Sequence, residues 1–78
     1  MAKFVNYLAI RRDYAAKTGP KACGFERYDK IKDKSGNIYI FIGVCDGVAV
    51  IEAEKKAENK DPFIKIESEE LSRYSKVN

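Results

Sequence analysis

The chain has 78 residues, 45% of them hydrophobic and 35% charged, with a net charge of +3 and no histidine. This length suits one small domain, and this composition is that of a globular chain and not of a disordered one. No apolar run approaches the roughly 18 residues of a membrane span, and the first residues lack the apolar core of a secretory signal. We therefore expect one cytoplasmic domain over residues 1–78, with no membrane partner.

The first predicted element is a helix over residues 3–17. Apolar side chains, Leu8 and Ala15 among them, fall on one stripe at 3.6 residues per turn. Gly19–Pro20 predicts the end of the helix, because glycine accepts a left-handed cap and proline cannot continue a helix. No N-cap residue is evident, and residues 4–10 are also compatible with a strand.

The next segment predicts a loop, a strand and a turn. We expect a loop over Lys21–Gly24 and a short strand over Phe25–Lys32. Asp33–Asn37 is rich in turn-forming residues, and Gly36 is able to take a positive φ. This turn leads into the most apolar part of the chain.

Ile38–Cys45 predicts the central strand, and Asp46–Gly47 is the dipeptide favoured in type I′ hairpins. Such a turn places Cys45 opposite Val48. One sheet face then carries the pairs Val44–Ala49, Ile42–Ile51 and Ile40–Ala53, and the other carries Gly43–Val50, Phe41–Glu52 and Tyr39–Glu54. A slip of one residue would exchange the faces and bury Glu52, so the apolar pattern favours this register.

The last third predicts two further pieces of regular structure. Ala53–Lys60 is typical of a long polar hairpin that ends at Asp61–Pro62, and Phe63–Glu67 predicts a short strand. Ser68 is placed to cap a helical turn over Ser68–Leu71, where acidic residues favour the positive end of the helix dipole. Ser75–Asn78 either adds a last few paired residues or frays.

These elements predict an α+β fold: an N-terminal helix packed on a small, strongly twisted antiparallel sheet of four or five strands, or on an SH3-like β-barrel over residues 25–77. The layout of residues 28–77 resembles SH3-like modules of bacteria and phages. The matching pieces are an opening strand at 28–33, a turn at 35–39, a hairpin at 43–47 and a strand at 63–66 that leads to Leu71. KOW-type domains are similar in layout, and that resemblance implies RNA or ribonucleoprotein partners.

The residue types argue against catalysis. Without histidine the commonest general base and metal ligand is missing, and Cys23 and Cys45 cannot complete a zinc site by themselves. No phosphate-binding, dinucleotide-binding or nucleophile-elbow motif occurs. We expect a non-enzymatic protein with no cofactor, metal or evident small-molecule substrate. We also expect both cysteines to be reduced thiols, with one structural disulfide as the alternative.

The charge distribution points to a binding surface in the first half. Residues 1–39 carry nine basic and four acidic side chains, a net charge of +5, whereas residues 40–78 carry six and eight, a net charge of −2. Aromatic rings bordered by cations are typical of single-strand nucleic-acid platforms. Tyr28 is a further aromatic near this set. The candidate binding residues are Arg11, Arg12, Lys17, Arg27, Lys30, Lys32, Tyr39 and Phe41.

Two alternatives stay open. If the helix covers the sheet face that carries Phe41, the contact set reduces to Arg11, Arg12 and Lys17 on the helix flanks. The partner is either a nucleic acid or ribonucleoprotein, or a protein. In the second case the chain would be an adaptor or inhibitor of the kind that phages and mobile elements encode.

Overall fold

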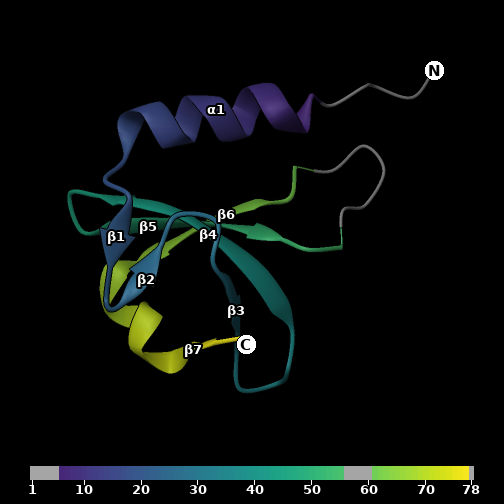
Figure 1. The fold of residues 1–78 in the computed structure, drawn as a ribbon, viewed down its shortest axis with the longest axis vertical. Coiled ribbons are helices and arrows are strands. Elements are labelled where there is room, and N and C mark those ends of the chain that lie inside the picture. The colour runs from purple at the N-terminus through teal and green to yellow at the C-terminus, as the bar shows by residue number, and fades with distance from the viewer. Residues whose placement is uncertain (1–5, 56–60, 78) are drawn as a thin grey trace.

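The computed structural model describes residues 6–55 and 61–77. Its elements, in chain order, are α1 (Tyr7–Lys17), β1 (Lys21–Ala22), β2 (Phe25–Glu26), β3 (Lys30–Lys32), β4 (Ile38–Cys45), β5 (Val48–Ala53), β6 (Phe63–Glu67), the 3₁₀ helix η1 (Ser68–Arg73) and β7 (Ser75–Lys76). α1 lies across one side of a five-stranded antiparallel sheet, and η1 lies on the other side (Figure 1). The predicted α+β class is confirmed.

The sheet is open and does not form the predicted barrel. Its strand order is β6-β5-β4-β3-β7, and β1 and β2 form a separate two-stranded sheet. Within the described strands, β6 pairs only with β5 and β7 pairs only with β3, so each has one free edge. β7 also decides the open question about the C-terminus, because Ser75 and Lys76 do pair.

Both ends of α1 differ from the prediction. The helix begins at Tyr7 because the Asn6 side chain accepts a hydrogen bond from the Ala9 N–H at 3.1 Å, an N-cap that was not evident in the sequence. The helix prediction for residues 7–10 is confirmed, whereas residues 3–5 lie outside the described part of the chain. At the other end the cap is Thr18 with φ −123° and ψ 153°, so no left-handed glycine is used.

The segment after the helix contains more strand than predicted. The expected loop at Lys21–Gly24 is half of the β1–β2 hairpin, whose turn residues Cys23 and Gly24 have φ values of 52° and 82°. The expected strand Phe25–Lys32 is split in two, because the backbone turns at Tyr28, where φ is 74°.

The β4–β5 hairpin follows the prediction at its turn and departs from it further along. Asp46 and Gly47 have φ values of 51° and 78°, as a type I′ turn requires, and the three pairs nearest the turn match. A bulge between Phe41 and Gly43 then shifts the register by one residue. Beyond it the observed pairs are Phe41–Ile51, Ile40–Glu52 and Tyr39–Ala53. The predicted Ile42–Ile51 pair is therefore wrong.

The bulge decides which residues form the core. The face of the sheet that carries Ile31, Phe41, Ala49 and Ile51, here called the inner face, packs against Phe25 and Leu71 in one apolar cluster. By alternation, Val50 and Glu52 point to the opposite side, which α1 covers and which is here called the helix face. The predicted assignment of Phe41 and Glu52 to a common face is thus wrong.

The C-terminal elements lie at their predicted positions in the chain, but the 3₁₀ helix differs from the prediction in its length and its N-cap. β6 has the predicted bounds. η1 is longer than the expected single turn, its N-cap is Glu67, and no side chain caps it, so the predicted capping role of Ser68 is wrong. The predicted polar hairpin at Ala53–Lys60 falls mostly on residues 56–60, outside the described residues.

Candidate binding surface

The register shift places a carboxylate beneath the helix. Glu52 is fully buried on the helix face, and Arg11 of α1 reaches it across the interface. Arg11 donates from Nε at 3.1 Å and from Nη2 at 2.5 Å to the Glu52 Oε1 atom. A buried carboxylate is costly unless a cation and hydrogen bonds satisfy it, and Arg11 supplies both. This pair ties the middle of α1 to β5.

The same guanidinium group lies over an aromatic ring. The Arg11 Cζ atom is 5.6 Å from the centroid of the Tyr28 ring, within the range of a cation–π contact. Tyr28 is 53% exposed although it is a large aromatic residue. The ring therefore has a cation beside it and a substantial area open to solvent.

The backbone of Tyr28 is in a conformation that L-residues with large side chains seldom adopt. Its φ of 74° lies in the left-handed region, which costs a non-glycine residue roughly 1–2 kcal/mol. Two backbone hydrogen bonds hold this segment against β4: the Tyr28 N–H donates to the Phe41 carbonyl at 2.6 Å, and the Phe41 N–H donates to the Asp29 carbonyl at 2.9 Å. The chain thus keeps an exposed tyrosine where glycine or asparagine would be less strained.

Tyr28 and α1 together border a hollow of about 290 Å³. Its lining residues are Leu8, Arg11, Arg12, Ala15 and Tyr28. Leu8 is 66% exposed, so its predicted place on a buried helix stripe is wrong. The helix is rotated so that Arg11 and Tyr14 face the sheet, with Tyr14 packed on Phe63 at a centroid distance of 5.3 Å.

The hollow combines an aromatic surface, an apolar side chain and two guanidinium groups. Arg12 is exposed at its rim. Such a set can stack a planar group on the ring and attract an anion to the arginines. Of the eight predicted binding residues, the hollow brings together Arg11 and Arg12, and it adds Tyr28.

The structure places the other predicted cations elsewhere. Arg27 has a structural task, because its guanidinium donates to the carbonyl oxygens of Ile42 at 2.8 Å and Thr18 at 2.6 Å. Lys17 forms an exposed pair with Asp13 at 3.4 Å, and Lys30 pairs with Glu54 at 3.2 Å. Lys32 is exposed on β3.

Two predicted aromatic contacts are on the inner face. Phe41 is fully buried, so it cannot stack on a ligand in this structure. Tyr39 packs edge-on against Tyr74 at a centroid distance of 5.8 Å, and burial raises the pKa of the Tyr39 phenol above its ordinary value. Phe41 is therefore excluded from the predicted stacking platform on β4, and Tyr39 is half-buried against Tyr74.

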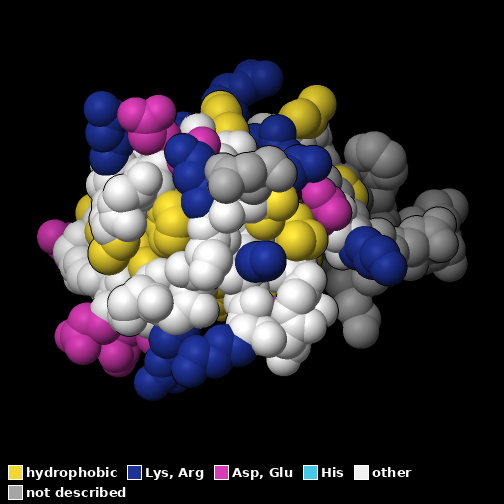
Figure 2. All heavy atoms as spheres, turned by 60° about the horizontal axis from the view of Figure 1, so that its bottom comes forward, with side chains coloured by type: hydrophobic (Ala, Val, Ile, Leu, Met, Phe, Trp, Pro, Cys, Tyr) yellow, Lys and Arg dark blue, Asp and Glu magenta, His cyan; other side chains and the backbone are white. Residues whose placement is uncertain are grey.

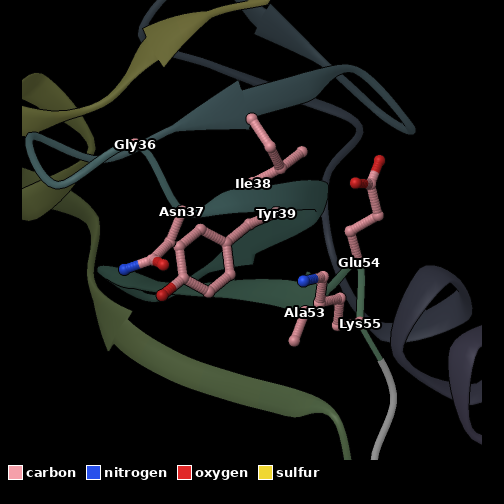
Figure 3. Close-up of a pocket in the computed structure, with 7 residues that line it drawn as sticks. All are labelled: Gly36, Asn37, Ile38, Tyr39, Ala53, Glu54 and Lys55. Atoms are coloured by element: carbon pink, nitrogen blue, oxygen red, sulfur yellow. The ribbon is translucent and has the colours of Figure 1, made fainter.

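A second hollow lies at the far end of the β4–β5 ribbon. It measures about 270 Å³ and is lined by residues 36–39 and 53–55. Figure 3 shows the side chains of Asn37 and Tyr39 directed to one side and those of Ile38 and Glu54 to the other. These groups do not converge on one point, whereas the polar groups of a ligand site usually do.

Surface charge alone does not define a site. Figure 2 shows Lys and Arg side chains spread over one face of the molecule, with acidic and hydrophobic groups between them. Several exposed lysines lie beside acids, as Lys21 does with Glu26 at 3.5 Å. Exposed pairs of this kind are strongly screened by salt. The geometry at Tyr28 is therefore more informative than the net charge.

Residues 6–55 and 61–77 offer little other functional chemistry. No group of three Cys, Asp or Glu side chains is arranged to hold a metal ion there. Cys23 and Cys45 are both exposed free thiols in this structure, so the alternative of a disulfide between them is not realised. Within these ranges, no helix has the length and apolar character needed to cross a membrane.

Comparisons of the chain with protein-family models, with curated proteins and with solved structures found no match.

Proposed function

We propose that the protein is a small non-catalytic module that binds nucleic acid through the hollow between α1 and Tyr28. One observation carries the proposal: a large aromatic ring is kept 53% exposed on a left-handed backbone and is bordered by arginines. Strained backbone of this kind persists where the surrounding structure enforces it, often at binding sites. Aromatic rings that stack on bases, with nearby cations that contact phosphates, are typical of sites that bind single-stranded nucleic acid.

The residues of the hollow support binding rather than catalysis. The five lining side chains are aliphatic, aromatic or guanidinium groups, with no carboxylate, thiol or imidazole among them. A nucleophile paired with a general base cannot be assembled from this set.

The order of elements supports the resemblance to SH3-like modules. A four-strand meander from β3 to β6 is followed by a short 3₁₀ helix and by a last strand that returns to β3. On this proposal the partner is RNA or a ribonucleoprotein, met in the cytoplasm. Fold-level likeness is a weaker argument for function than the site itself.

A protein partner is the second candidate, and the exposure of Leu8 favours it. Leu8 and Tyr28 are 66% and 53% exposed and line the same hollow. Apolar and aromatic side chains at the centre of a patch, with arginine beside them, are typical of protein interfaces. An adaptor or inhibitor of the phage type would use the same residues.

A salt titration tests the proposal. We expect labelled single-stranded DNA and RNA of about 12 nucleotides to bind at about 50 mM salt, with affinity falling steeply as salt increases. Fluorescence anisotropy measures this directly. Arg12→Ala should weaken binding by a similar factor for every sequence and lower the salt slope by about 0.7, the value for one phosphate contact on a single strand.

The matched control is Lys34→Ala, which removes one charge from the β3–β4 turn, on the side of the molecule away from α1 (Figure 1). We expect this variant to bind like the wild type. Absence of wild-type binding to either nucleic acid at low salt would overturn the proposal and favour the protein partner. Equal losses in the Arg12 and Lys34 variants would contradict the location of the site.

A further inference from the structure

Arg11 and Arg12 are neighbours in the sequence, but their guanidinium groups have different surroundings. Arg12 is exposed. Arg11 is 26% exposed and directs Nε and Nη2 to one oxygen of the buried Glu52 carboxylate. The positive charge of Arg11 is thus largely offset by Glu52, which leaves Arg12 as the better phosphate contact at the hollow.

The Arg11–Glu52 pair also fixes the plane of the guanidinium group. Two hydrogen bonds from different nitrogens restrict its rotation, and Tyr28 lies 5.6 Å from its central carbon. Planar guanidinium groups stack on aromatic rings, so a fixed guanidinium restricts the ring beside it.

The backbone conformation of Tyr28 also restricts the position of its ring. Its φ of 74° and the 2.6 Å hydrogen bond from its N–H to Phe41 set the direction in which the side chain leaves the chain. The ring is therefore held by the strained backbone and by Arg11 together. A ring ordered before binding loses less conformational entropy when a ligand stacks on it.

We infer, resting on the proposed function, that the site takes single-stranded nucleic acid with an unstacked base on Tyr28, and that Arg11 is a positioning residue for that ring. Bases in a duplex are already stacked on their neighbours, so a single aromatic ring can engage only a base that is free of its stack. Glu52 acts through Arg11, and Arg12 supplies the phosphate contact.

The key variant is Arg11→Met combined with Glu52→Leu. It replaces a buried ion pair by apolar groups of similar size and leaves the net charge unchanged. We expect wild type to bind a single strand at least about tenfold tighter than a duplex of the same sequence. The double variant should lose about three- to tenfold in single-strand affinity with an unchanged salt slope. By contrast, Arg12→Met should lower that slope by about 0.7, the value for one phosphate on a single strand.

A double-mutant cycle links Arg11 to Tyr28. Tyr28→Ala should weaken single-strand binding in wild type. The same substitution should cause a smaller loss of affinity in the Arg11–Glu52 double variant, because that variant has already disturbed the position of the Tyr28 ring. Circular dichroism checks that each variant is folded. If the double variant does not fold, Arg11→Lys replaces it: it keeps a cation near Glu52 but lacks the planar group, and the same loss at constant slope is expected.

A spectroscopic probe gives an independent readout. The chain has no tryptophan, so Tyr28→Trp introduces a single one whose fluorescence should be quenched when a base stacks on it. Quenching by the single strand and not by the duplex supports the inference.

The outcomes separate the inference from the proposed function. Equal binding of duplex and single strand overturns the single-strand inference, and a lower salt slope in the Arg11–Glu52 double variant overturns the positioning role of Arg11. The nucleic-acid proposal stands in both cases. Unquenched tryptophan fluorescence from the Tyr28→Trp variant in the presence of bound single strand overturns the stacking step. Absence of wild-type binding to both forms overturns the proposed function and this inference with it.

Discussion

The two faces of the five-stranded sheet are covered in different ways. On the inner face, Phe41, Ile31 and Leu71 are fully buried in one apolar cluster. On the helix face, α1 contributes no fully buried residue, and the ion pair between Arg11 and Glu52 crosses the interface. Apolar area alone holds the inner face, whereas the helix face combines apolar and aromatic contacts at Val50 and Tyr14 with the directional Arg11–Glu52 pair.

The two faces therefore contribute differently to the stability of the fold and to the geometry of the binding surface. Burial of apolar surface contributes roughly 25 cal/mol per Å², so the apolar cluster dominates the folding free energy of so small a chain. A buried ion pair contributes little net stability, because desolvation offsets its attraction, but it defines geometry closely. We therefore expect substitutions on the inner face to act mainly on stability, and those on the helix face to act on the position of α1.

The largest effect is expected for Phe41→Ala. Removal of this fully buried ring leaves a cavity opposite Ile51 and should lower the free energy of unfolding by about 3–5 kcal/mol. Because small domains have low total stability, much of the variant should be unfolded at 37 °C. Urea denaturation followed by circular dichroism measures the loss. Ile64→Ala, at a site that is 40% exposed, is the control and should cost far less; equal losses would contradict the assignment of the core.

Arg11→Ala should have the next largest effect. It removes the Arg11 ion pair from the buried Glu52 carboxylate, and we expect a loss of about 2–3 kcal/mol in the free energy of unfolding, limited by the ability of α1 to move and admit water. Arg11→Met with Glu52→Leu should restore stability to within about 1 kcal/mol of wild type. A double variant no more stable than Arg11→Ala would show that the ion pair itself holds the helix.

Gly43→Ala tests how closely the end of α1 approaches the sheet. An added Cβ would lie 2.6 Å from the Thr18 Cβ and 2.8 Å from the Gly19 carbonyl oxygen, so the chain there must shift. We expect a loss of about 1–3 kcal/mol, seen as a lower midpoint in thermal unfolding. Gly19→Ala is the matched control, because its Cβ would meet only the Val44 carbonyl oxygen at 3.5 Å. A midpoint unchanged by Gly43→Ala would mean that α1 can move away from β4 at little cost.

The smallest effect concerns an ion pair at the sheet margin. The Glu26 N–H donates to the Asp29 carboxylate at 2.9 Å, and this hydrogen bond, opposed in part by desolvation and aided by Lys76, holds the pKa of Asp29 below its ordinary value of 3.8. Because the folded-state pKa of Asp29 lies below the ordinary value, the ionised carboxylate stabilises the fold fully at pH values above the ordinary pKa. This stabilisation is lost as the pH falls through the folded-state pKa.

We therefore expect Asp29→Asn to melt slightly below wild type near neutral pH, with the difference shrinking as the pH falls below 3.8 and through the lowered folded-state pKa of Asp29. Thermal unfolding across this pH range measures it. Asp46→Asn, in the β4–β5 turn, controls for the loss of one carboxylate. A difference between Asp29→Asn and wild type that persisted at low pH would assign the effect to something other than this charge.

Local chemistry was sufficient to predict much of the fold from the sequence. The α+β class, β4, β6 and the type I′ turn at Asp46–Gly47 follow from short-range signals, because positive φ and strand alternation depend on adjacent residues. The same reasoning identified Arg11 and Arg12 as candidate contacts. It missed the Asn6 cap and the strained backbone at Tyr28, for which the sequence carries no distinctive signal.

The bulge at Ile42 and the burial of Glu52 were decided only by the tertiary structure. The predicted register kept Glu52 on the less apolar face, which one alternative left open and the other placed under the helix. Here α1 covers the second face, and Arg11, 41 residues before Glu52, makes burial of the carboxylate possible. Alternation along a strand cannot reveal a partner so distant in the chain. For the same reason, the sequence determines which residues can form the site, and the packing of α1 on the sheet determines that Arg11 and Tyr28 meet.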